Sequence, residues 1–220
     1  MIALFFEVTP RPGQDDRYLE IAAGLKPALE TNGGIVFLDR FRSLSRPRTL
    51  LSHQIWQDEA SLARWRANGR HYGAQTAGRT AVFEDYRLRI GVVVAARREP
   101  GHATETAPGI AYNDPAAKPE RFVVVVRSTG AAFASGASNS SSGESSSGET
   151  WRSVYNDASF AWVAAVPDRA AGLAIIHRAS ADPCVSAAQL CLVSRDYGMF
   201  DRHEAPQYFP EAGARQSSGT

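Results

Sequence analysis

The order of strands and helices in the first 94 residues restricts the fold more than any other feature of this sequence. A near-continuous apolar run at 2–9 predicts a first strand that is buried on both faces. The further elements expected are a helix at 14–30, kinked or shortened by Pro27, strands at 35–42 and 49–56, a helix at 58–76 and a strand at 83–94. This order predicts an α+β chain with a ferredoxin-like βαββαβ sheet and two helices on one face.

The expected strands at 2–9 and 35–42 leave one face of that sheet without a cover. Both carry apolar residues on their two faces, whereas two helices can cover only one side of a sheet. An uncovered apolar face needs a partner, and a second copy related by a two-fold axis is the simplest one. We therefore expect a homodimer that forms a dimeric α+β barrel.

The second half of the chain has a different character, and no repeat of the first half is visible in it. Strands are expected at 122–126, 160–166, 173–177 and 189–194. A tract rich in Ser and Gly predicts a disordered loop at about 129–150. The expected division is a ferredoxin-like domain at 1–95, an insertion of uncertain fold at 96–192 and a C-terminal tail at 193–220. The insertion is interpreted either as a genuine addition or as a gene-model artefact.

The composition restricts the classes of partner and the cellular compartment that we expect. The formal net charge is +1, so neither nucleic acid nor an anionic membrane is expected as a partner. Two cysteines make no disulfide framework, and no group of His and Cys has the spacing of zinc ligands. No apolar run reaches the length of about 18 residues that a spanning helix needs. A cytoplasmic protein is the expectation.

The expected helix at 58–76 carries the candidate site. Asp58 is a plausible N-cap, and a bend is expected at Gly69 or Gly73. One stripe of this helix holds large aromatic side chains and amides, as ligand pockets often do: Trp65, Asn68, Tyr72 and Gln75. The alternative is that the aromatic members are core residues whose polar atoms find backbone partners.

The first half resembles the antibiotic biosynthesis monooxygenase family of small dimeric ferredoxin-like proteins. The resemblance rests on FEVTPRPG at 6–13, FLDRFRSL at 37–44, LLSHQIWQDEASLARWR at 50–66 and AGRTAVFEDYRLRI at 77–90. The segment SRDYGMFDRHEAP at 194–206 is similar to the tail that follows the fourth strand in this family. About a hundred residues separate the two parts here.

One branch of this family oxidises aromatic substrates with dioxygen and no metal, flavin or haem. The resemblance implies a helix tryptophan at Trp65, with Asn68, His71 and Tyr72 as catalytic candidates and no cofactor. Such chemistry needs a dry pocket and a route to a deprotonated substrate that can reduce oxygen. Arg87 supplies a residue type that this branch also uses, although the spacing does not reproduce the pattern.

Four residues are candidates for binding a small hydrophobic or aromatic substrate: Phe6, His53, Gln75 and Arg87. A lone histidine on a strand, such as His53, is more often a satisfied structural residue. Alternating arginines on a strand are more often edge or interface charges.

A second branch of the family degrades haem with an Asn on the first strand, the helix tryptophan and a proximal histidine. Phe6 occupies the Asn position, and the histidine position falls near Gln75. On a continuous helix His71 lies about 120° away from Trp65 and points away from its stripe. Haem degradation is therefore disfavoured.

The sequence leaves three functions open. The first is a cofactor-independent monooxygenase that oxidises a small aromatic or quinol-like substrate. The second is a non-catalytic dimer that binds a small ligand or serves in a stress response. The third is a lyase or isomerase that uses the same anionic intermediate without oxygen. One scaffold can host all of these activities.

Overall fold

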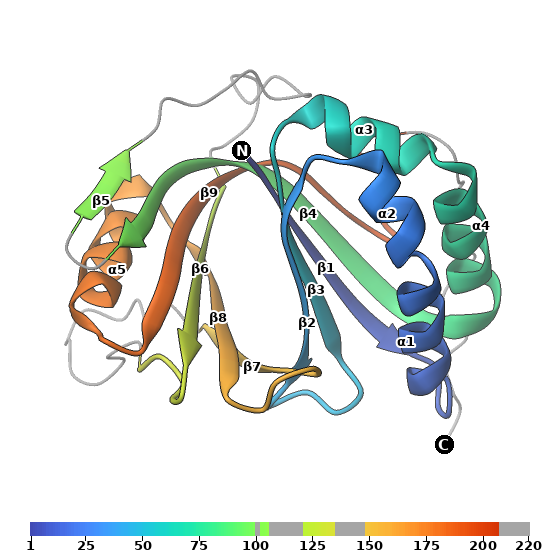
Figure 1. Ribbon diagram of the computed structural model, residues 1–220, viewed down its shortest axis with the longest axis horizontal. Helices are drawn as coiled ribbons and strands as arrows, with labels where there is room; N and C mark the ends of the chain where they lie inside the picture. The colour runs from blue at the N-terminus through green and yellow to red at the C-terminus, as the bar shows by residue number, and fades with distance from the viewer. Residues whose placement is uncertain (100–101, 106–120, 135–147, 207–220) are drawn as a thin grey trace.

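The computed structural model describes residues 1–99, 102–105, 121–134 and 148–206. Eight strands close into a barrel, and helices lie on its outside (Figure 1). The sheet order is β1-β3-β2-β7-β8-β6-β9-β4-β5, and an additional pairing of β1 with β4 closes the ring. Strand β5 lies outside the ring as an extra edge next to β4.

The first half has the expected βαββαβ order. Its strands are β1 (Ile2–Pro10), β2 (Ile35–Ser43), β3 (Leu50–Trp56) and β4 (Phe83–Glu99). Its helices are α1 (Asp15–Gly24), α2 (Lys26–Asn32), α3 (Glu59–Ala67) and α4 (Gly69–Ala77), followed by a π-helical turn η1 (Gly78–Val82). Each of the two expected helices is thus divided into two. Pro27 lies in the first turn of α2, where its missing N–H and fixed φ are tolerated.

The second half repeats the strand order of the first. Its elements are β5 (His102–Glu105), β6 (Phe122–Thr129), β7 (Glu149–Ser153), β8 (Ser159–Val166), α5 (Arg169–Ala181) and β9 (Val185–Gly198). The order β9-β6-β8-β7 matches β4-β1-β3-β2, and α5 occupies the place of α3 and α4. No repeat is visible in the sequence, because the repeat lies in the topology of the strands.

Three expected strands of the second half are confirmed within β6, β8 and β9, and one is wrong. The segment 173–177 lies in helix α5, which the Asp168 side chain caps by accepting from the N–H of Ala171. A short apolar run cannot by itself distinguish a strand from a buried helix. Residues 135–147, the main part of the expected disordered loop, lie outside the described residues. The flanking residues 129 and 149–150 belong to β6 and β7.

The strands of the segment 96–192 belong to the same barrel as the strands of the segment 1–95. Two seams join the halves: β2 pairs with β7 and β4 pairs with β9, both antiparallel. Arg46 ties the halves together near the first seam, since its guanidinium donates to both Glu7 and Glu149. It also lies 5.0 Å from the ring centre of Trp151.

The inner face of the barrel is filled by side chains from both halves. The buried members of this cluster include Ala3, Phe5, Phe41, Leu51, Ile55, Val123, Val125, Trp151, Val163 and Cys191. The face that was expected to require a second copy is therefore covered by the second half of the same chain. This removes the physical argument for the homodimer.

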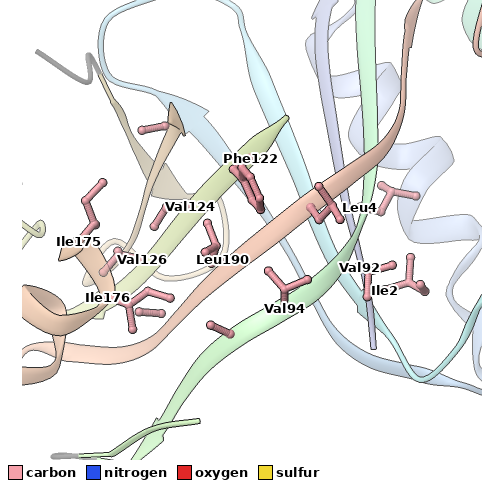
Figure 2. Packing of buried hydrophobic residues seen from close by; sticks show 14 of the residues in the cluster. Ile2, Leu4, Val92, Val94, Phe122, Val124, Val126, Ile175, Ile176 and Leu190 are labelled. Carbon is pink, nitrogen blue, oxygen red and sulfur yellow. The ribbon is translucent and has the colours of Figure 1, made fainter. Parts of the chain in front are cut away.

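The outer face carries a second, continuous cluster that extends from one half to the other. Figure 2 shows Ile2, Leu4, Val92 and Val94 of the first half together with residues of β6, α5 and β9. Helix α5 inserts Ile175 and Ile176 into this cluster. At about 25 cal/mol per Å² of buried apolar area, such a continuous layer resists separation of the two halves.

We expect Gly91→Ala to destabilise the barrel at the seam of β4 and β9. A Cβ on Gly91 would lie 2.5 Å from the carbonyl oxygen of Leu192, next to a bulge in this pairing. Because backbone cannot rotate away, the expected loss of unfolding free energy is about 1–3 kcal/mol, measured by urea unfolding. Gly24→Ala is the control, since nothing lies within 4 Å of its Cβ position. Equal stability of both variants would contradict the close approach.

We expect the chain to be a monomer in solution, because its barrel is closed by its own strands. Light scattering at micromolar concentration should give a mass near 23.8 kDa. Twice that mass would support the homodimer expected from the sequence and require a contact on the outer surface.

Candidate functional site

A cavity of about 640 Å³ lies between helices α1 to α4 and the outer face of the first-half sheet. Its walls are mostly apolar, with side chains such as Leu4, Ile21, Leu25, Leu29, Leu62 and Ile90. The volume is typical of sites for small organic ligands. The break between α1 and α2 and the break between α3 and α4 bend the helical layer around this space (Figure 1).

Trp65 and His71 form a stacked pair in the wall of the cavity. Asn68 ends α3 with φ −64° and ψ 127°, and its side chain accepts from the N–H groups of Arg70 and His71 to start α4. Because the helix breaks there, the His71 ring turns back over Trp65, with ring centres 4.5 Å apart. The expectation that His71 points away from Trp65 was wrong, since it assumed one continuous helix.

The hydrogen bond and the burial of the His71 ring determine its protonation state. Its Nδ1 lies 3.0 Å from the carbonyl oxygen of Trp65, so Nδ1 carries the proton and donates it to that oxygen. Burial lowers the pKa of His71 to about 4, which the bond to the Trp65 carbonyl only partly offsets. Near neutral pH, His71 is therefore an uncharged ring whose Nε2 can accept a hydrogen bond.

The sheet contributes a short polar chain to the floor of the cavity. The indole N–H of Trp56 donates to Oε1 of Gln54 at 2.9 Å, and Nε2 of Gln54 donates to Oγ of Ser52 at 3.2 Å. Trp56 is fully buried, so this bond satisfies its polar atom. Gln54 is held in one orientation as a result.

A cationic group lies on β2 at another part of the cavity wall. Arg40 donates to the hydroxyl oxygen of Tyr155 at 3.0 Å and also hydrogen-bonds Tyr18 of α1. Tyr155 follows β7, so the second half of the chain contributes to this wall. Burial raises the pKa of Tyr18, although Arg40 opposes the shift. Tyr18 therefore remains a protonated hydroxyl.

Four of the residues singled out in the sequence line the cavity: Phe6, Trp65, His71 and Gln75. Trp65 is 5% exposed, and its side chain belongs to the outer core cluster. Phe6 comes from β1 and Gln75 from α4, so three different elements bring these residues together. Their chemical roles stay predictions.

The other four do not line the cavity. Asn68 is occupied as the N-cap of α4, and Tyr72 is 44% exposed. His53 points into the barrel, where its ring stacks on Phe5 at 4.7 Å. Arg87 pairs with Asp196 across the seam of β4 and β9 at 2.6 Å.

Sequence reasoning missed Tyr18, Arg40, Gln54 and Tyr155 as cavity residues. Arg40 and Gln54 share the outer face with Leu38 and Ser52, and alternation along the strands could have indicated this. Tyr155 gave no signal, because its place depends on the second half closing the barrel.

A model of the family described as antibiotic biosynthesis monooxygenase matches residues 1–77. A protein of Pyricularia oryzae named jasmonate monooxygenase ABM is 35% identical over 219 residues, which cover 96% of this chain and all of that protein. The chain belongs to the antibiotic biosynthesis monooxygenase family. For this family member, the match over both halves indicates that the segment beyond residue 95 is shared with a relative.

Solved structures are less similar in sequence to this family member than the Pyricularia oryzae protein is. A Lactobacillus acidophilus protein covers 89% of this chain and 94% of its own, with 6% identity and a TM-score of 0.41. A Shewanella oneidensis protein covers 48% of this chain and 92% of its own, with 13% identity and a TM-score of 0.39. The family membership rests on the sequence relative.

The described residues of this family member contain neither a metal-ligand cluster nor a membrane-spanning helix. Their His, Cys, Asp and Glu side chains form no group of three or more suited to a metal ion. Within the same residues, every helix is too short or too polar to cross a membrane.

The stability of this family member should fall as the pH drops below about 6.5. Burial lowers the pKa of His71 to about 4 and that of His53 to about 3, where Arg127 adds to the effect of burial. Unfolded histidines take up protons first, so each contributes a loss of up to about 1.4 kcal/mol per pH unit between its two pKa values. Urea unfolding at pH 7.5, 6, 5 and 4 measures this.

In His71→Gln, the free energy of unfolding should fall less between pH 6.5 and pH 4 than it does in wild type. His177→Gln is the control, because His177 is exposed on α5 and should leave the curve unchanged. The same slope in wild type and His71→Gln would show that His71 is not held neutral by burial.

Proposed function

We propose that the chain is a monooxygenase that oxidises a small, mostly apolar substrate with dioxygen in the cavity under α1 to α4. The observation that carries this proposal is the Trp65–His71 pair in the wall of an apolar cavity of about 640 Å³. Family membership and the name of the Pyricularia oryzae relative support the same class of reaction. The walls are mostly apolar, which favours an oxidation that proceeds through a reactive intermediate.

In this proposal the substrate supplies the electrons and no cofactor is needed. An activated methylene next to an aromatic ring or carbonyl loses a proton to Nε2 of His71, and the resulting anion reduces dioxygen. The peroxide that forms on the carbon takes this proton back. A carbon-bound peroxide then loses water, so that CH₂ and O₂ become C=O and H₂O. One oxygen atom remains in the product, and the other leaves with the two methylene hydrogens. Anthrones have such a methylene, and a quinol-like substrate has one next to the carbonyl of its keto tautomer.

The cavity residues have separate tasks in this reaction. The Trp65 ring forms a flat wall against which a planar substrate stacks. The neutral Nε2 of His71 accepts a hydrogen bond from the enol or phenol hydroxyl of the substrate and aligns it with this wall. Gln54, fixed by Trp56 and Ser52, offers an amide for substrate oxygen atoms.

Two substrate groups follow from different observations. Anthrones and hydroquinones follow from the chemistry of a substrate that provides its own electrons. Jasmonate follows from the name of the relative, whose match covers 96% of this chain. Hydroxylation of a saturated C–H needs two further electrons, so the jasmonate assay includes a nicotinamide donor.

Oxygen uptake by the purified chain tests the function. We expect uptake with at least one member of a panel of anthrones, hydroquinones and jasmonate, and label from ¹⁸O₂ in the product. His71→Phe should lower the rate by about 100-fold, the lower range for a group that handles a substrate proton. Trp65→Phe should raise KM more than it lowers kcat, because it removes a binding wall.

Tyr72→Phe is the matched control, since Tyr72 lies one residue from His71 but is exposed and does not line the cavity. Its rate should stay within about twofold of wild type, as for a typical surface change. Saturable binding of the panel without oxygen uptake would favour a ligand-binding protein. Equal losses in His71→Phe and Tyr72→Phe would remove His71 from the reaction.

A further inference from the structure

Arg40 places a positive charge in the cavity wall, and the fold supplies little that would balance this charge. It lies on the outer face of β2, level with Ser52 on β3, in the half of the strand that leads to the β7 seam. Its neighbours there are Tyr18 of α1 and Tyr155 of the turn between β7 and β8. Tyr155 is 64% exposed whereas Tyr18 is 6% exposed, so the group lies between solvent and the cavity interior.

In the described part of the chain, no carboxylate forms an ion pair with the Arg40 guanidinium, although Asp39 interacts with its charge at longer range. Among the described residues its side chain donates to phenol oxygens, and no Asp or Glu oxygen lies within 4.0 Å of its guanidinium nitrogens. Other arginines near the barrel ends have acidic partners, as Arg46 has in Glu7 and Glu149. A partly buried cation in an apolar wall is unfavourable unless an anion joins it. The missing anion is therefore expected from a ligand.

The two phenols strengthen this interpretation. A hydroxyl oxygen that accepts from a guanidinium still has its own O–H to donate. Tyr18 and Tyr155 can therefore both donate to an oxygen placed beside Arg40. A planar guanidinium with two flanking O–H donors suits the two oxygens of a carboxylate.

The charge balance favours a carboxylate over a phosphate. One arginine neutralises one negative charge, and a phosphate would keep a second charge next to apolar walls. The rest of the lining is mostly aliphatic and aromatic, with Lys26, Glu30 and Arg66 as its other charged members. The uncharged Trp65–His71 pair forms another part of the wall. A fitting ligand therefore has one carboxylate at one end and an apolar body.

We propose that Arg40, Tyr18 and Tyr155 form the carboxylate-binding subsite of the cavity, and that the substrate is a small apolar monocarboxylic acid. The acid group lies near solvent at Arg40, and the apolar body extends toward Trp65 and His71. That the bound acid is a substrate rests on the proposed function. The binding of an acid does not depend on oxidation. It also gives Tyr155, a residue of the second half, a part in recognition.

Calorimetric titration with matched acids and amides tests the subsite. The probes are 1-naphthaleneacetate with 1-naphthaleneacetamide, and octanoate with octanamide. Wild type should bind the acid of a pair about 10- to 100-fold more tightly than its amide, the range of a hydrogen bond to a charged group. Arg40→Met should remove this preference, and Tyr18→Phe should reduce it for the acids only.

Arg42→Met is the matched control. Arg42 lies two residues further along the same face of β2, is exposed and does not line the cavity. It should keep the wild-type preference for acids. Arg40→Lys, which keeps the charge, should keep part of it and provides a second test if Arg40→Met does not fold.

Three outcomes would overturn the subsite: acids that bind no more tightly than their amides in wild type, Arg40→Met weakening acid and amide equally, or Arg42→Met having the same effect as Arg40→Met. The titrations contain no turnover step. Acid binding at Arg40 without any oxygen uptake would therefore reject the proposed oxidation and leave the subsite in place.

Discussion

Closure of the sheet by the chain's own second half is the constraint on which the rest of this structure depends. The strands β1 to β4 have two apolar faces, and a single layer of helices can cover only one of them. The seams of β2 with β7 and of β4 with β9 bring β6 to β9 against the other face. Because the second half covers that face, α1 to α4 can leave a cavity between themselves and the sheet without exposing the core.

The breaks in the helical layer determine the chemistry that this cavity can support. At Leu25 and Asn68 the chain turns, and the layer curves around the space instead of packing flat on the sheet. The second break also brings His71 onto Trp65. A straight helix would have buried Trp65 alone and directed His71 elsewhere. Burial then keeps this histidine neutral, because its ring bonds to a backbone carbonyl that requires a proton on Nδ1 and to no carboxylate of the described residues.

Much of the first half could be predicted from the sequence, because its periodicity and helix caps are strong local signals. Apolar runs and Asp58 gave the strands and the start of α3, and Trp65 was correctly placed in the cavity wall. Asn68 was misassigned, since the same residue type suits a pocket or an N-cap and only tertiary context decides. Three strands of the second half were predicted, but its place in the barrel was not, because its repeat is carried by strand order. Tyr155 reaches the cavity only once the barrel is closed.

The two halves of this barrel belong to one chain, so their sequences need not be identical. In a barrel made of two copies, every residue that shapes one pocket also appears in the other, so neither can change alone. Here Phe133 and Trp162 pack edge to face at 5.8 Å in the outer cluster of the second half. That half can therefore specialise in support while the first half diversifies its ligand. Asymmetry of this kind lets selection adjust one recognition surface without disturbing the scaffold that holds it.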